Sequence, residues 1–365
     1  MRKREYERFQ AQSADDRRGV FTETARRIGI SDFLAEKDYW VCRVIDLVMK
    51  EPPWAPKRFF KGGTSLSKGF GIIERFSEDI DIVFNRHTLK CDEGIAFKGD
   101  FDPADPEVVF LGNDGRPSQK KREQRFEKLQ DACGRFISGP MKDKLSRALP
   151  ECRVVTSCEE PQTLFVRYPS LFVEANLDAQ EDDEHGYFLP RVKIEGGARS
   201  AQSPSVERPV VPYVQHELGN GLNLEISNVT MISPARTFLE KIAIVHGHNC
   251  RFRDDARVPG DRNRLSRHYS DLARLSLHPM GRRAMRNAEL LDDVREHDKL
   301  AFRSAWRKHD ELHHGRLQIM PANEVRQVLE QDYARMQDMM YGDRQDFNWV
   351  MDRLREIDTV MNRRD

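Results

Sequence analysis

Two neighbouring stretches decide how this chain folds: residues 60–67 read Phe-Lys-Gly-Gly-Thr-Ser-Leu-Ser, and residues 75–84 read Arg-Phe-Ser-Glu-Asp-Ile-Asp-Ile-Val-Phe. Side chains two apart in a strand point to the same face, so Asp79 and Asp81 are predicted to lie side by side. The intervening isoleucines and phenylalanine then face a core. With the glycine pair as a turn, residues 57–84 are predicted to form strand, turn, helix, strand.

This combination indicates a candidate site for a nucleoside triphosphate (NTP) and a metal ion. Two convergent carboxylates, Asp79 and Asp81, can bind Mg²⁺ or Mn²⁺, hard cations that prefer oxygen ligands. The backbone N–H groups of Gly62 and Gly63 can approach a triphosphate because no side chain stands in the way. Hydroxyl donors come from Thr64 and Ser65. Either half alone is equally typical of a tight turn or an acidic surface loop, so the prediction depends on their order.

The composition describes a globular protein with a strongly charged surface. The chain has 365 residues, 38% of them apolar and 33% charged, and its 60 basic and 60 acidic residues cancel. No stretch is apolar for long enough to span a membrane, and the charged N-terminus lacks a secretory pattern. Six scattered cysteines without a C-x-x-C spacing favour reduced thiols. We therefore expect a cytoplasmic protein without a membrane partner, and a monomer.

The periodicity of the sequence divides the chain near residue 230. Helices are predicted over 3–27 and 34–49, and an insertion over about 87–150. The sequence predicts an α/β (α+β) core with a mixed sheet over 1–230, followed by an α-helical domain over 231–365. Four further strands of the core are predicted at 152–157, 162–168, 187–195 and 222–229.

Three more polar residues are candidates for the site. Glu195 shares a strand face with Lys193, so it could be a third metal ligand or a base, or one half of a surface ion pair. Lys241 lies in a helix that Ser233 and Pro234 begin, where it could reach a phosphate or be a solvated lysine. Asp271 could hold Lys241 or orient a nucleotide hydroxyl.

Two stretches have an excess of basic residues and could contact an RNA backbone. Residues 118–147 contain nine Lys or Arg against four Asp or Glu, and residues 251–267 contain six Arg against three Asp. A solvated helix face or a loop with ion pairs is an equally good interpretation of each stretch alone.

The sequence His-Asp-Glu-Leu-His at 309–313 has the histidine spacing of a zinc metalloprotease. Asp310 stands where such an enzyme needs its glutamate base, and it is one methylene too short to reach zinc-bound water in the same way. The motif therefore argues against a zinc hydrolase.

Six ordered motifs resemble those of the nucleotidyltransferase AbiEii/AbiGii toxin family, and the resemblance extends over most of residues 30–345. They are FKGGTSLSK, RFSEDIDIVF, YPS, RVKIEGGARS, PARTFLEKIAIVHG and RHYSDLARL. The resemblance implies a polymerase-β-like nucleotidyltransferase core joined to a helical domain. It also implies the toxin of a bacterial type IV toxin–antitoxin or phage abortive-infection system, with NTP and Mg²⁺ as requirements. Better-understood members add nucleotides to tRNA 3′ ends, and a cognate antitoxin encoded nearby need not bind the toxin.

The resemblance assigns roles residue by residue. The glycine turn and the pair of aspartates match the family, and Ser77 stands where relatives keep a small hydroxyl residue. Lys241 matches the phosphate-contacting lysine and Asp271 the late acidic motif. Glu195 lies where many nucleotidyltransferases have a third carboxylate. The 87–150 insertion is longer than the family pattern, which leaves the acceptor open.

Two other functions compete with transfer to RNA. A protein with this fold could bind GTP or another NTP without catalysis and sequester a partner. Alternatively, it could transfer the nucleotide to a protein. A variant that loses toxicity on mutation of Asp79 and Asp81, yet still binds GTP, would argue against the pure binder.

Overall fold

The computed structural model describes the chain in two compact units. The first comprises Met1–Phe70 and Phe76–Met231, and the second comprises Gly71–Arg75 and Ile232–Asp365. The described residues are 3–50, 57–85, 89, 119–173, 189–219, 221–260, 264–302 and 304–363. Much of the first part of the predicted insertion, residues 87–88 and 90–118, lies outside them. Residues 71–75 belong to the second unit, although the sequence analysis placed them in the core over 1–230.

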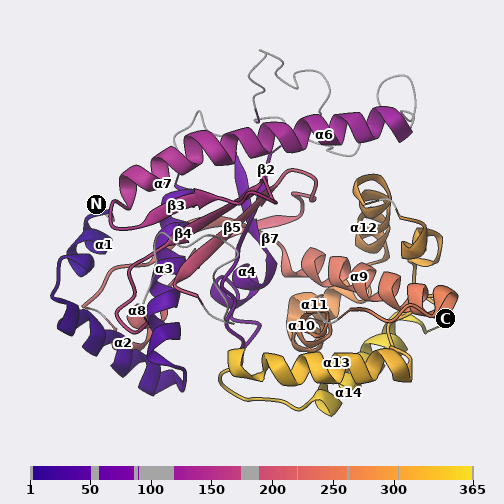
Figure 1. Cartoon of the computed structure of the whole chain (residues 1–365). Helices are drawn as coiled ribbons and strands as arrows, with labels where there is room; N and C mark the ends of the chain where they lie inside the picture. The colour runs from indigo at the N-terminus through magenta and orange to yellow at the C-terminus, as the bar shows by residue number, and fades with distance from the viewer. Residues whose placement is uncertain are drawn as a thin grey trace. The chain divides into compact units, whose positions relative to one another are not determined.

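A seven-stranded mixed sheet forms the centre of the first unit (Figure 1). Its strand order is β3-β4-β5-β2-β1-β7-β6, with β2 antiparallel to β1 and parallel to β5. The strands are β1 (Arg58–Lys61), β2 (Ile80–Phe84), β3 (Arg153–Thr156), β4 (Thr163–Arg167), β5 (Arg191–Gly197), β6 (Ser205–Val210) and β7 (Ile226–Ile232). This mixed sheet confirms the predicted α/β class of the core.

Helices surround this sheet, and Figure 1 shows the long helical segment α6–α7 running alongside it. The helices of the first unit are α1 (Lys3–Gln10), α2 (Ala14–Ile28), α3 (Asp32–Met49), α4 (Gly62–Lys68), α6 (Gln119–Phe136), α7 (Lys142–Ala148) and α8 (Tyr213–Leu218). A π-helical turn, Ile137–Met141, joins α6 to α7. Buried side chains of α3, among them Trp40, supply much of the core, and Trp40 stacks on Tyr168 with ring centroids 5.0 Å apart.

The second unit is helical, as predicted. It contains α9 (Pro234–Asp255), α10 (Ser266–Leu277), α11 (Pro279–Ala284), α12 (Ala288–Ala301), α13 (Asn323–Met336) and α14 (Phe347–Met361). Helix α9 begins at the predicted place, because the Ser233 hydroxyl accepts a hydrogen bond from the backbone N–H of Ala235 and Pro234 occupies the first turn. Across the described part of the chain, no helix is both long and apolar enough to cross a bilayer.

Several elements differ from the prediction. The first helix is two helices, because Ser13 caps a new one by accepting from the N–H of Asp16. The strand expected at 222–229 begins only at Ile226. The backbone of Leu224 is engaged elsewhere, because its N–H donates to the Gln215 side chain and its carbonyl accepts a hydrogen bond from the Tyr6 hydroxyl. Strand β6 and helix α8 were not predicted. The sequence of β6 does not resemble a strand because it contains Pro209 and charged residues. A proline is tolerated in β6 because β6 is an edge strand.

Candidate active site

One row of directly paired residues crosses four strands of the first unit. Lys61 on β1 pairs with Asp81 on β2, Asp81 pairs with Glu195 on β5, and Glu195 pairs with Thr163 on β4. Directly opposite residues project to the same face, and neighbouring strands are about 4.8 Å apart. Asp81 and Glu195 are therefore one strand spacing apart on one face. Asp79, two residues before Asp81, comes immediately before β2.

Asp79 is surrounded by negative charge. Burial, together with the carboxylates of Glu78, Asp81 and Glu195, raises its pKa to about 7, with Lys193 acting in the opposite direction. Repulsion among nearby carboxylates is the condition that a bound cation relieves. The first unit therefore contains a carboxylate cluster whose charged state favours a positive ion.

Gly62 makes room for one of these carboxylates. Its φ is +78°, and a Cβ atom at this position would lie 1.8 Å from Oδ2 of Asp81. Any side chain at this position would force the Asp81 carboxylate to move. The absence of a side chain at Gly62 therefore leaves the room that the Asp81 carboxylate occupies.

The hydroxyls of the turn are engaged inside the protein. Thr64 and Ser65 are fully buried. The Thr64 hydroxyl bonds to the Asp79 carbonyl and lies 2.9 Å from the Ser77 hydroxyl, and the Ser65 hydroxyl donates to the Gly62 carbonyl at 2.9 Å. Ser65 thus closes the turn, and Thr64 connects it to the acidic segment. In this structure their side chains hold the site in shape.

Helix α3 supports the acidic segment through consecutive charged residues that the sequence had left without a role. The buried ammonium of Lys37 donates to Glu78 and, at 2.8 Å, to the Leu189 carbonyl. The neighbouring Asp38 pairs with Lys68 at the end of α4. Helix α3 thereby secures both the segment before β2 and the helix after the glycine turn. The signal in the sequence was the unusual Glu-Lys-Asp run inside an apolar helix.

Glu195 retains contact with solvent, since 41% of its side chain is exposed. The ammonium of Lys193 pairs with Glu195 and lies 3.3 Å from Glu160 in the turn between β3 and β4. The predicted face shared by Lys193 and Glu195 is confirmed, because Val192 and Ile194 are fully buried.

A second predicted pair, Lys241 and Asp271, lies in the helical unit. The ammonium of Lys241 on α9 is 3.0 Å from Oδ2 of Asp271 on α10. Asp271 also accepts two hydrogen bonds from Arg75, each 2.9 Å long. Burial alone would raise the pKa of Asp271, but the charges of Arg75 and Lys241 outweigh it and hold the pKa well below its usual range. Asp271 therefore holds Lys241, one of the two arrangements that the sequence left open.

Arg75 was missed by sequence reasoning, although it lies four residues before Asp79. Its segment is bound to the helical unit by a backbone bridge between Arg75 and Met340 and by a hydrogen bond from the Tyr341 N–H to the Glu74 carbonyl. An arginine directly before the acidic motif was the only hint in the sequence. Its partner, Asp271, is 196 residues away along the chain.

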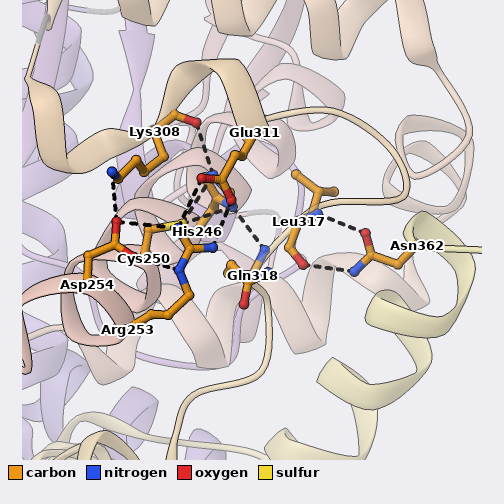
Figure 2. Close-up of polar contacts among 9 residues, drawn as sticks. All are labelled: His246, Cys250, Arg253, Asp254, Lys308, Glu311, Leu317, Gln318 and Asn362. Atoms are coloured by element: carbon orange, nitrogen blue, oxygen red, sulfur yellow. Dashed lines mark hydrogen bonds and ion pairs between the residues drawn. The ribbon is translucent and has the colours of Figure 1, made fainter.

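The histidine pair that resembles a zinc motif has structural roles. Residues His309–Glu311 form a 3-10 turn, and the His309 ring pairs with Asp298 at 2.7 Å. Figure 2 shows Glu311 among the polar contacts of α9, where Arg253 donates to it at 2.7 and 3.0 Å. The ring of His313 faces the His314 carbonyl instead. These separate partners agree with the argument against a zinc hydrolase.

The Asp79–Asp81 site fits a Mg²⁺ ion that takes only part of its ligands from the protein, and does not fit an ion held by protein side chains alone. Within the described ranges, no three His, Cys, Asp or Glu side chains converge as ligands of one ion. Mg²⁺ is usually held by one or two carboxylates, with phosphate oxygens and water supplying the remaining ligands. Asp79 and Asp81 meet this requirement, and the space above Gly62 lets Asp81 take its position.

A glycine turn beside paired strand carboxylates is typical of a nucleotidyltransferase. The comparison with protein families agrees with this class: the model described as "Nucleotidyl transferase AbiEii toxin, Type IV TA system" matches residues 46–354. The chain therefore belongs to the AbiEii nucleotidyl transferase toxin family of type IV toxin–antitoxin systems.

A search of curated proteins found no match. Among solved structures, the chain is similar to MenT4, a nucleotidyltransferase toxin from Mycobacterium tuberculosis. The two are 18% identical, with 94% of this chain and 97% of that chain covered and a TM-score of 0.36.

Proposed function

We propose that this protein transfers a nucleoside monophosphate from an NTP to an acceptor hydroxyl at the 3′ end of a tRNA, with Mg²⁺ bound by Asp79 and Asp81. The observation that carries the proposal is the row from the glycine turn through Asp81 to Glu195. It brings a phosphate-accessible turn, a cation-binding carboxylate and a possible base together on one face of one sheet. The protein would act in the cytoplasm as a toxin controlled by a cognate antitoxin.

The reaction forms one bond and breaks one. The acceptor oxygen attacks the α-phosphorus, and an O–P bond forms. The bond from that phosphorus to the bridging oxygen of pyrophosphate breaks, and pyrophosphate leaves with the electron pair. The acceptor proton passes to the Glu195 carboxylate, which remains accessible from solvent. Bound Mg²⁺ would neutralise phosphate charge during this exchange.

The residues of the turn serve by positioning. Gly62 and Gly63 offer backbone N–H groups to the triphosphate. Thr64 and Ser77 keep the turn next to the Asp79 segment, and Ser65 closes the turn on the Gly62 carbonyl. Such prearranged donors lower the barrier without reorganising during the reaction.

Lys241 is proposed to neutralise the leaving phosphates, a role that rests on its match to the family motif. The carboxylate of Asp271 and the ring of His268 lie within 3.0 and 3.4 Å of its ammonium. Asp271 is then a positioning residue, because both of its oxygens contact cations of the chain itself. A variant Lys241→Met that binds NTP normally and transfers at the wild-type rate would contradict this role.

The proposal is tested with labelled substrates. Purified protein, Mg²⁺ and total bacterial tRNA are incubated with each α-labelled NTP in turn, beside an Asp81→Ala variant whose melting curve shows that it is folded. We expect label in tRNA with the wild type alone. Label in a protein would move the acceptor to that class. NTP binding without any transfer would favour the alternative of a non-catalytic NTP-binding module that sequesters a partner.

A further inference from the structure

A cleft of about 820 Å³ lies in the first unit, between α6 and the turn that joins β3 to β4. Its lining includes Asp131, Arg135 and Ser138 from the helical side, Glu160 and Gln162 from the turn, and Glu195 at one end. This volume is in the range of sites that bind a small organic molecule. The cleft therefore opens directly onto the candidate base.

The walls of the cleft are held in place by their own hydrogen bonds. The Gln162 side-chain amide donates to the Gln130 carbonyl of α6 at 3.1 Å, which connects the turn to the helix. The Thr163 hydroxyl donates to Glu160 at 3.0 Å, and the Glu160 N–H donates to the Ser157 hydroxyl at 3.1 Å. A prearranged wall reduces the entropy lost when a ligand binds.

The sheet order places this cleft on the side of the carboxylates away from the glycine turn. Strand β1, which leads into Gly62, is one neighbour of β2, and β5 is its other neighbour, with β4 beyond. The turn residues that come just before β4, which begins at Thr163, line the cleft. Phosphoryl transfer requires the attacking and leaving oxygens to be roughly in line, on opposite sides of the phosphorus. With the triphosphate at the turn, an acceptor would approach from the cleft.

The charges of the lining select against phosphate groups. Asp131, Glu160 and Glu195 contribute three carboxylates, against the one guanidinium of Arg135. The amides of Gln130 and Gln162 and several hydroxyls make up most of the remaining polar lining. Amide groups hydrogen-bond to the edges of nucleobases, and hydroxyls to sugars. The lining thus suits an uncharged nucleoside.

Helix α6 also offers a path for the phosphates that precede such a nucleoside. Lys128 and Arg135 are exposed on α6, on the same side as Asp131. Basic side chains along a helix bind a nucleic-acid backbone without reading its sequence.

We propose that this cleft binds the terminal nucleoside of an RNA acceptor and presents its 3′ hydroxyl to Glu195. The inference rests on the proposed transfer reaction, because the position of the donor triphosphate gives the cleft its role. It adds the residues that hold the acceptor, on α6 and on the turn between β3 and β4.

The test fills the cleft with a tryptophan. Asp131→Trp places an indole in it from an exposed helix position, and Gln124→Trp, seven residues earlier on the same exposed face, is the matched control. Equal melting temperatures would show that both variants fold. Ser138→Trp replaces the first variant if it does not. Binding of a short 5′-fluorescein single-stranded RNA with a free 3′ hydroxyl is followed by anisotropy without NTP, and transfer is measured separately.

We expect Asp131→Trp to weaken RNA binding, and to raise the KM for RNA, by at least about tenfold, with the KM for NTP unchanged and Gln124→Trp near wild type. A raised KM for NTP instead would mean that the cleft holds the incoming base, and would overturn the inference. Unchanged binding and kinetics in a folded variant would overturn it too, while wild-type transfer would leave the proposed function standing. If the wild type binds RNA in the cleft but transfers nothing, the proposed function fails and the binding site remains.

Discussion

Asp79 in the first unit and Asp271 in the second show how surroundings decide what a carboxylate can do. The neighbours of Asp79 are mostly carboxylates, and its pKa is raised to about 7. Asp271 is completely enclosed, yet Arg75 and Lys241 hold its pKa well below the usual range. The first carboxylate gains from an external cation, whereas the second already has two internal ones. This contrast supports the proposed roles of Asp79 as a metal ligand and of Asp271 as a positioning residue.

The largest effect on stability is expected from Asp271→Asn. The substitution leaves Arg75 and Lys241 buried without their negative partner, and breaking a buried ion pair in this way costs about 3–5 kcal/mol of unfolding free energy. Denaturant unfolding measures it.

Asp352→Asn is the matched control for that substitution, because Asp352 forms an exposed pair with Arg355 on α14. We expect a change below about 0.5 kcal/mol there. If the two variants lost the same stability, Asp271 would not be held as described.

A smaller effect, on activity, is expected from Gly62→Ala. The new methyl group would overlap Oδ2 of Asp81 and displace it, and a misplacement of this kind reduces the transfer rate by about a hundredfold. Gly197→Ala on β5 is the control, since a Cβ there would meet no atom within 4 Å. Equal rates of label transfer in the two variants would show that the turn does not position Asp81.

The smallest effect, opposite in sign to that of Asp271→Asn, is expected from Asp79→Asn. Because folding raises the pKa of Asp79, the folded protein keeps a proton that the unfolded chain loses. The contribution of Asp79 to the stability of the wild type therefore falls as pH rises from about 4 to 7, and then levels off. At pH 8 the variant should be more stable by about 1–2 kcal/mol, because it lacks this contribution.

Adding Mg²⁺ sharpens the same comparison. At pH 8 the ion should raise the melting temperature of the wild type and leave that of Asp79→Asn nearly unchanged. If Asp79→Asn were less stable than the wild type at pH 8, the negative charge of Asp79 would already be balanced by positive groups of the protein.

The sequence predicted the parts of the site that local patterns encode. Alternation between Ile and Asp predicted β2, and the Ser-Pro pair predicted the start of α9. Arg75 could not be predicted as a partner of Asp271, because helix and strand periods carry no information about contacts so distant along the chain. The cleft was missed for the same reason, since its wall combines α6 with a turn that follows it by some 20 residues.

The membership of residues 71–75 in the helical unit has a consequence for dissecting this protein. The chain leaves the first unit after Phe70 and re-enters it at Phe76, three residues before Asp79. A fragment ending at Met231 would therefore carry Arg75 without Asp271, and Arg75 would lose its buried partner although Ile232 is the one strand residue removed. We therefore expect expression of the first unit alone to require the helical unit in trans, or a redesigned connection between α4 and β2.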